Sequence, residues 1–208
     1  MNKTNEFDTK ASGWDQSQMH RDRAAAIAED ILKTLPLNRD MKVLEYGAGT
    51  GLTSFILKDR FSEITMLDNS DGMLAVLNEK ITASGASNLK ALKFDLEKEN
   101  WPYGKFDLIL TQMVLHHVSD IDTIISKFSK MLNQGGYIAI ADLYTEDGSF
   151  HGEGFTGHNG FDPDKLGQTL RSDGFTSVDH HKCFVVNKHI GENKTRPFDV
   201  FLLTAKLS

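Results

Sequence analysis

The stretch that decides the fold is VLEYGAGTG, residues 43–51. An apolar run typical of a buried strand carries a carboxylate, Glu45, and is followed by three glycines at alternate positions, Gly47, Gly49 and Gly51. Glycines after a first strand let the backbone approach a nucleotide closely at the start of the next helix. The stretch therefore predicts an α/β fold with a nucleotide-type ligand at the end of its first strand.

The carboxylate in this stretch indicates which ligand fits. A dinucleotide loop has the pattern G-x-G-x-x-G, but the position of its third glycine is Leu52 here. Glu45 beside a pyrophosphate would also cost roughly a few kcal/mol in charge repulsion. S-adenosylmethionine has no phosphate and carries an ammonium and a sulfonium, so the stretch predicts this cofactor.

Short apolar runs alternate with amphipathic helical segments along the chain, as in an open sheet with crossover helices. A helix over 120–133 is expected to begin at Asp120 as its N-cap and to end at the glycines of QGG, residues 134–136. HIGEN, residues 189–193, is a plausible hairpin connection, so one of the last two strands is expected to be antiparallel. The expected strands are 41–47, 63–68, 89–96, 106–113, 137–143, 176–188 and 196–207, and the other helices are 20–35, 53–60, 72–84 and 162–175.

Bulk properties limit the class of protein. The 208 residues suit one domain, and the net charge of −6 argues against a general nucleic-acid binder. The single cysteine, Cys183, excludes an internal disulfide, and its neighbours favour a half-buried strand residue over a reactive thiol. The polar N-terminus and the absence of an apolar run of about 20 residues predict a cytoplasmic protein that does not enter a membrane.

Two further acids end successive strands. Asp68 follows the glycine loop by about 20 residues, where an acid binds ribose hydroxyls in this architecture. Ser70 is the better candidate for capping the helix that follows it. Asp95 ends the third strand, where an acid accepts a hydrogen bond from an exocyclic amine, with Leu96 against the purine.

Five motifs carry a family resemblance: VLEYGAGTG, MLDNSDGML, KFDLEKE, FDLILTQMVLHHVSD and LNQGGYIAIAD. In this order and spacing, over residues 41–142, they resemble class I S-adenosylmethionine-dependent methyltransferases, and most closely the small-molecule branch with the ubiquinone/menaquinone-type enzymes. The resemblance implies a doubly wound, mostly parallel seven-stranded sheet, a Rossmann-like methyltransferase fold with one antiparallel terminal strand. It also implies an N-terminal helical cap over the cofactor.

The resemblance assigns cofactor contacts to named positions. Glu45 and the loop glycines would contact the methionine moiety, Asp68 the ribose, and Asp95 with Leu96 the adenine. Gln112 and Met113 would border the transferred methyl, and Trp14 would cover the methionine end. The full expected cofactor set is Glu45, Gly47, Ala48, Gly49, Gly51, Asp68, Asn69, Met73, Asp95, Leu96, Gln112, Met113 and Trp14.

Three histidines are candidates for catalysis. His116, of the pair His116–His117, follows the fourth strand, while His151 and His158 lie in the polar segment 143–162, the expected substrate loop. A near-neutral histidine takes a proton from a hydroxyl or amine, but methyl transfer does not always require a base. For the pair His116–His117 the alternatives are packing in the pocket wall and metal binding. For the segment 143–162 they are a lid that only closes the cavity and a metal site formed by His151, Glu153 and His158. We predict no metal site.

We interpret residues 1–208 as one methyltransferase domain, with 1–40 as its N-terminal cap segment and a small molecule as its acceptor. A monomer or homodimer is expected. The alternatives are a tRNA or protein methyltransferase, a catalytically silent S-adenosylmethionine-binding protein, and an oxidoreductase with an atypical dinucleotide loop. The sequence does not identify the acceptor or the atom that is methylated.

Overall fold

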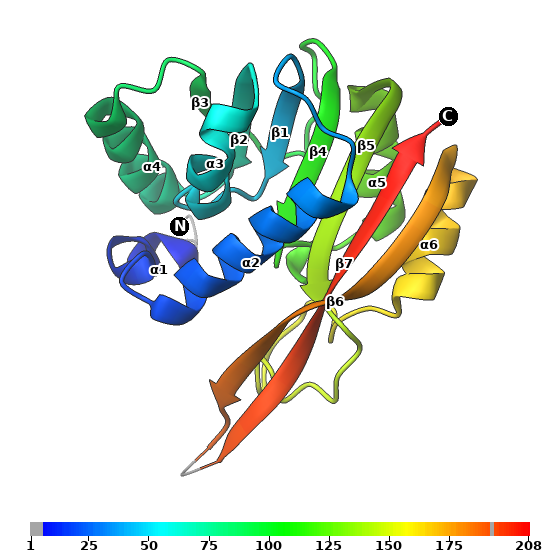
Figure 1. The fold of residues 1–208 in the computed structure, drawn as a ribbon. Helices are drawn as coiled ribbons and strands as arrows, with labels where there is room; N and C mark the ends of the chain where they lie inside the picture. The colour runs from blue at the N-terminus through cyan, green and yellow to red at the C-terminus, as the bar shows by residue number, and fades with distance from the viewer. Residues whose placement is uncertain (1–5, 192–193) are drawn as a thin grey trace.

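A computed structural model describes residues 6–191 and 194–208, which form a seven-stranded sheet flanked by helices (Figure 1). The strand order is β3-β2-β1-β4-β5-β7-β6. The strands are β1 Lys42–Tyr46, β2 Glu63–Asp68, β3 Leu89–Lys93, β4 Phe106–Gln112, β5 Leu132–Leu143, β6 Phe175–His189 and β7 Thr195–Leu207. The helices are α1 Glu6–Trp14, α2 Gln18–Thr34, α3 Leu52–Leu57, α4 Asp71–Ser84, α5 Ile121–Met131 and α6 Pro163–Ser172, with short 3-10 helices η1 Lys58–Arg60 and η2 Leu115–His117.

The strand directions confirm the predicted topology. Strands β1 to β5 pair in parallel, whereas β7 pairs antiparallel with both β5 and β6. The chain order reverses beside β1, because β2 lies on one side of it and β4 on the other. A ligand in such a sheet binds beyond the carboxyl ends of the strands at this reversal, which here is the end of β1 with its glycine loop.

Two apolar layers hold the helices on opposite faces of the sheet. Alternate residues of a strand point to opposite faces, so Val43 joins one layer and Leu44 the other. The first layer includes Ile27 of α2 and Leu77 of α4, and the second includes Phe128 of α5. This burial on both faces explains the continuous apolar runs that predicted the central strands.

The N-terminal cap consists of two helices. The apolar spacing that predicts a helix over 20–35 corresponds to α2, whose Ala24, Ile27 and Ile31 are buried. The shorter α1 has little apolar character of its own and lies against α4, near the glycine loop (Figure 1). It is therefore held by tertiary contacts more than by its amphipathic pattern.

The end of α5 corrects one prediction. Asp120 caps the helix as expected, because its side chain accepts from the backbone N–H of Thr123. The glycines of 134–136 do not cap it, since α5 ends at Met131 and β5 begins at Leu132. Pairing of Leu132 with Phe106 of β4 starts the strand there, so sheet pairing outweighs the local glycine signal.

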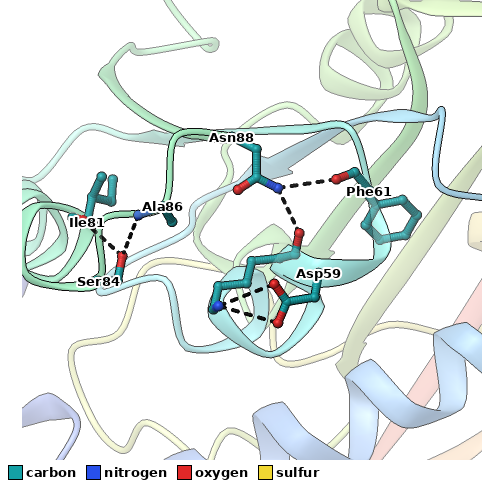
Figure 2. Close-up of polar contacts among 7 residues, drawn as sticks. Asp59, Phe61, Ile81, Ser84, Ala86 and Asn88 are labelled. Carbon is teal, nitrogen blue, oxygen red and sulfur yellow. Dashed lines mark hydrogen bonds and ion pairs between the residues drawn. The ribbon is translucent and has the colours of Figure 1, made fainter.

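A side-chain clamp fixes the corner between α3, α4 and β3 (Figure 2). The Asn88 amide donates to the carbonyl of Lys58 at 2.7 Å and to that of Phe61 at 3.2 Å. Ser84, in the last turn of α4, accepts from the N–H of Ala86 at 3.2 Å. The Asn88 bonds join the connection before β2 to the connection after α4, while the Ser84 bond lies within the latter.

Strands β6 and β7 extend beyond the sheet as a long two-stranded arm (Figure 1). Their antiparallel pairing continues to His189 and Thr195, which supports the predicted hairpin, although residues 192–193 of the predicted connection lie outside the described residues. The segment between β5 and α6 packs on this arm, with the Phe150 and Phe198 rings 5.1 Å apart. Within the described chain, no helix is both long enough and apolar enough to cross a membrane.

Candidate functional site

A cavity of about 460 Å³ lies at the carboxyl ends of β1, β2 and β4. Its walls come from four parts of the chain: the N-terminal cap, the strand-end loops, the segment 143–162 and the β6–β7 arm. The volume is within the range of small-molecule sites, roughly 300–1,000 Å³. The predicted cofactor position and the predicted substrate loop therefore share one cavity.

The glycine loop forms the floor of the cavity through its backbone. Gly47 has φ +68°, and a Cβ there would lie 2.4 Å from the Val114 side chain, so only glycine fits. The N–H of Gly49 donates to the Asp68 carboxylate at 2.7 Å. Gly51, also at positive φ, precedes α3 and faces Leu77, so it does not line the cavity.

Glu45 lies behind this floor and is almost completely buried. The Ser54 hydroxyl donates to one of its carboxylate oxygens, while the other, Oε1, has no partner among the described residues. Burial raises the pKa of Glu45 to about 7, against the opposing effect of the Ser54 bond. A buried acid with an unsatisfied oxygen is suited to a cationic ligand group, although Glu45 does not itself line the cavity.

Two strand-end acids line the cavity as predicted. Asp68 accepts from the N–H groups of Gly49 and Ser70, so it ties β2 to the glycine loop. Burial raises the pKa of Asp68, and these backbone bonds oppose the rise. Asp95 pairs with Lys98 at 2.6 Å, and the neighbouring Leu96 is fully buried beside it. Ser70, not Asp68, caps α4.

The N-terminal cap is fastened over the cavity by two aspartates. Asp8 of α1 accepts from the Ser70 hydroxyl at 2.6 Å and from the Gly72 N–H at 2.9 Å. Asp15 accepts from the Thr50 hydroxyl at 2.5 Å and pairs with Lys80 at 2.6 Å. These contacts place three side chains of α1 in the cavity wall: Phe7, Lys10 and Trp14.

The end of β4 contributes two predicted residues. Gln112 donates to the Thr53 hydroxyl, and its amide oxygen is buried without a partner among the described residues. Met113 has φ +55°, an uncommon conformation for a residue with a side chain. Strained backbone of this kind clusters at functional sites. Both residues line the cavity.

His116 is held by a buried carboxylate that sequence reasoning missed. Its Nδ1 lies 2.6 Å from Oδ1 of Asp142, and both side chains are almost fully buried. Because a carboxylate only accepts, Nδ1 carries the proton of this bond, so Nε2 is the nitrogen with the lone pair in the neutral ring. Asp142 lies near the carboxyl end of β5, as Asp68 lies at the end of β2 and Asp95 just after β3, and that position was the signal available in the sequence.

The segment 143–162 brings His151 to His116. The two ring centroids are 4.9 Å apart, and His151 stacks on Phe155 at 3.8 Å. Burial, followed by the neighbouring imidazoles, lowers the pKa of His151 to about 3. A base with so low a pKa is a poor proton acceptor near pH 7, so a role for His151 as general base is disfavoured.

His158 anchors the same segment and does not line the cavity. Its backbone N–H donates to the His116 carbonyl at 2.8 Å, and its Nε2 lies 3.0 Å from the Val118 carbonyl. At the adjacent Gly157 a Cβ would lie 2.2 Å from that His116 carbonyl. The segment is thus packed on η2, and His158 has an anchoring position outside the cavity.

Two cationic side chains, the buried Arg23 and the partly buried Lys188, also line the cavity, and neither was predicted. Arg23 is 7% exposed, and its Nε has no partner among the described residues. Burial lowers the pKa of Arg23 to about 10. Lys188 lies 4.3 Å from the Phe150 ring centroid and donates to its carbonyl. The sequence did contain a signal for Arg23: a charged residue stands one helical turn before Ile27, on the otherwise apolar face of α2.

The structure thus gathers nearly all of the predicted residues around one cavity. Those that line it are Gly47, Ala48, Gly49, Asp68, Asn69, Met73, Asp95, Leu96, Gln112, Met113, Trp14, His116 and His151; those that do not are Glu45, Gly51 and His158.

Comparison with known proteins agrees with this geometry. The family described as "Methyltransferase domain" matches residues 44–140, from β1 through β5. Over residues 44–140 the chain is therefore similar to S-adenosylmethionine-dependent methyltransferases of class I.

Relatives that match this chain include uncharacterized methyltransferases. The protein C1347.09 of Schizosaccharomyces pombe is 29% identical over 142 residues, or 61% of this chain and 50% of the relative. YcgJ of Bacillus subtilis is 26% identical over 135 residues, 63% of this chain and 53% of YcgJ. The chain thus spans about half the length of these two relatives. A Staphylococcus carnosus methyltransferase is 27% identical over 86% of this chain and 83% of its own.

Solved structures show the same methyltransferase fold. A chain from the complex of the Haloferax volcanii Trm112 methyltransferase activator with a methyltransferase aligns with TM-score 0.76 at 17% identity, covering 98% of this chain and 97% of that one. The YcgJ structure aligns with TM-score 0.70 at 15% identity, covering 88% of this chain and 98% of YcgJ.

Proposed function

We propose that the protein transfers a methyl group from S-adenosylmethionine to a small-molecule acceptor bound in the same cavity. The observation that carries the proposal is a single cavity in which a glycine floor, two strand-end acids and a helical cap surround unsatisfied buried polar groups. The family match to residues 44–140 and the resemblance to the ubiquinone/menaquinone-type branch support it.

The unsatisfied groups fit the amino-acid end of S-adenosylmethionine. Glu45 Oε1 is a buried acceptor that lacks a donor, and an α-ammonium group supplies one. Arg23 Nε is a buried donor that lacks an acceptor, and an α-carboxylate supplies one. Gly47 also fits a bound cofactor, since any side chain there would collide with Val114 and fill the floor of the cavity.

The remaining cavity residues have roles in binding and orientation. We assign Asp68 to the ribose hydroxyls and Asp95, with Leu96, to the adenine. The aromatic cap, Phe7 and Trp14, excludes water from the methionine end and offers an aromatic face to a cation. When bound, the cofactor supplies an activated methyl group on its sulfonium.

The acceptor belongs on the side of the cavity where the segment 143–162 meets the β6–β7 arm. Phe150 and His151 line that side, together with Val186, Asn187 and Lys188 of β6. The cap and the loop segment both contribute to the cavity wall, and such a site suits a small molecule better than a folded macromolecule. A net charge of −6 also disfavours RNA as the acceptor.

A labelling experiment distinguishes the acceptor classes. Protein would be incubated with methyl-labelled S-adenosylmethionine and, separately, with a small-metabolite extract, total RNA and denatured protein. We expect label in the small-metabolite fraction only. Label in RNA or protein would contradict the acceptor assignment, and cofactor binding without labelling of any fraction would favour a catalytically silent binding protein.

A further inference from the structure

Three histidines meet in the wall of the cavity from two segments far apart in the sequence. His116 and His117 belong to η2, and His151 belongs to the segment after β5. One ligand nitrogen from each lies within 4.8 Å of the others. The sequence did not predict this grouping, because the packing of 143–162 on η2 creates it.

We propose that His116, His117 and His151 bind a divalent transition-metal ion, with Zn²⁺ as the type case, on the acceptor side of the methyltransferase cavity. Three histidines with an open fourth position are a known arrangement for catalytic zinc. This metal site goes beyond the proposed methyl-transfer function. Only the statement that it lies on the acceptor side of the cavity rests on that function.

The orientation of His116 supports a metal ligand. Asp142 accepts the Nδ1 proton at 2.6 Å and also accepts from the His116 backbone N–H at 3.3 Å, so the ring is fixed with Nε2 as its lone-pair nitrogen. A carboxylate that holds the second nitrogen of a ligating histidine is the usual outer partner in zinc sites. Asp142 is fully buried and also accepts from the Leu143 N–H at 2.7 Å, so it is itself well fixed.

The second ligand, His151, is held in place but lacks a partner for one nitrogen. Its ring stacks on Phe155 with an interplanar angle of 13°. Its Nδ1 is buried and has no hydrogen-bond partner among the described residues. A buried polar nitrogen without a partner is costly, and a metal ion would satisfy it.

The nitrogens need only a small contraction to hold an ion. Zinc–nitrogen distances of about 2.0–2.1 Å place tetrahedral ligand atoms about 3.4 Å apart, against the 4.8 Å limit of the cluster. His117 and His151 are only partly buried, so the cluster is open to the cavity on their side. The ring centroids of His116 and His117 are already 4.3 Å apart.

The chemistry of the cluster selects the class of ion. Magnesium and calcium require oxygen ligands, and the cluster contains only imidazoles. Lys188 and Arg23 line the same cavity, and their positive charges disfavour an ion that is held only by electrostatic attraction. Imidazole nitrogens bind zinc, copper, nickel and cobalt through their lone pairs, so the site is expected to prefer these ions over magnesium.

Metal titration of the intact, chelator-treated protein tests the proposal without any substrate. Co²⁺ would be followed by its visible absorption and Zn²⁺ by calorimetry. We expect one equivalent to bind with a Kd below about 10 µM and a tetrahedral-type Co²⁺ spectrum. A Kd for Zn²⁺ weaker than about 100 µM, or an equal response to Mg²⁺, would overturn the proposal.

Two variants and a matched control locate the ion. His151→Phe keeps the stack on Phe155, and His117→Phe keeps the edge contact with Phe7, so both preserve packing. Each should weaken Zn²⁺ binding by at least about 10-fold. The control is the double variant His180→Ala/His181→Ala, which removes the histidine pair on β6 whose rings contact Asp164 and Asp30.

The control should bind Zn²⁺ within about twofold of wild type. Unchanged binding by His151→Phe, or loss of binding in the control, would overturn the assignment. S-adenosylhomocysteine binding, measured separately on the same variants, is expected to persist. If the wild-type protein does not bind S-adenosylhomocysteine, the proposed function is refuted. The metal titration still tests the metal site in that case, because it uses no cofactor.

Discussion

At the scale of single residues, the site is governed by a few buried groups with incomplete hydrogen bonding. Glu45, Arg23 and Gln112 each have a buried polar atom without a partner in the described chain. Such groups are costly in a native protein and need an explanation. A ligand with both an ammonium and a carboxylate explains the first two, which is why we place the methionine end of the cofactor beside the glycine loop.

Replacement of Asp68 tests the ribose assignment. We expect Asp68→Ala to weaken S-adenosylhomocysteine binding by about 10- to 100-fold, because a hydrogen bond to a charged group is worth about 1.5–3 kcal/mol. Calorimetry measures the affinity, and thermal unfolding checks that the variant folds. Asp71→Ala is the control, since Asp71 is exposed and pairs with the exposed Lys93. Equal affinity for wild type and Asp68→Ala would refute the assignment.

The raised pKa of Glu45 predicts how stability changes with pH. Between about 4.5 and 7 the folded protein keeps a proton on Glu45 that the unfolded chain releases, so the free energy of unfolding falls as pH rises through this window. Glu45→Gln removes that fall. Without ligand, the variant should be the more stable protein at pH 8, by up to about 3 kcal/mol, and should lose this advantage near pH 5.

Urea unfolding at pH 5, 7 and 8 measures this difference, with Glu153→Gln in the exposed loop as the control. The same Glu45→Gln variant should bind S-adenosylhomocysteine more weakly, because the neutral amide no longer attracts an ammonium. Parallel pH profiles for wild type and variant would show that Glu45 does not titrate as described.

At the scale of elements, the cavity depends on two segments fastened over the sheet. Helix α1 is held to the start of α4 by Asp8, and the segment 143–162 is held to η2 by His158. Both attachments use close backbone contact at a glycine, Gly72 for α1 and Gly157 for the segment. The cap was predicted from the sequence, but α1 itself was not, because polar contacts with α4 stabilise it.

A single added methyl group tests the docking of α1. A Cβ at Gly72 would lie 2.6 Å from the Asp8 backbone, so Gly72→Ala should displace α1 while leaving the sheet folded. We expect S-adenosylhomocysteine affinity to fall at least about 10-fold, because Phe7 and Trp14 leave the cavity wall. The control is Gly104→Ala, where a Cβ meets nothing within 4 Å. Unchanged affinity and unchanged protease sensitivity of residues 6–16 in Gly72→Ala would contradict the role of the cap.

At the scale of the whole molecule, the sequence predicts the sheet better than it predicts the site. The seven strands, and the antiparallel strand within the terminal pair, follow from the spacing of apolar runs and from the family resemblance. Partners that meet only through the fold were missed, such as Asp142 for His116, 26 residues away. Arg23, in the N-terminal cap, was missed for the same reason: the sequence does not show which side of α2 borders the cavity.

The central claim is that the glycine loop and its acids bind S-adenosylmethionine and not a dinucleotide. Calorimetric titration of the purified chain with S-adenosylhomocysteine and, separately, with NAD⁺ and NADH tests this most directly. We predict one-to-one binding of S-adenosylhomocysteine and no detectable heat with either dinucleotide, since Glu45 repels a pyrophosphate. Tight binding of NAD⁺ or NADH, with no binding of S-adenosylhomocysteine, would contradict the account.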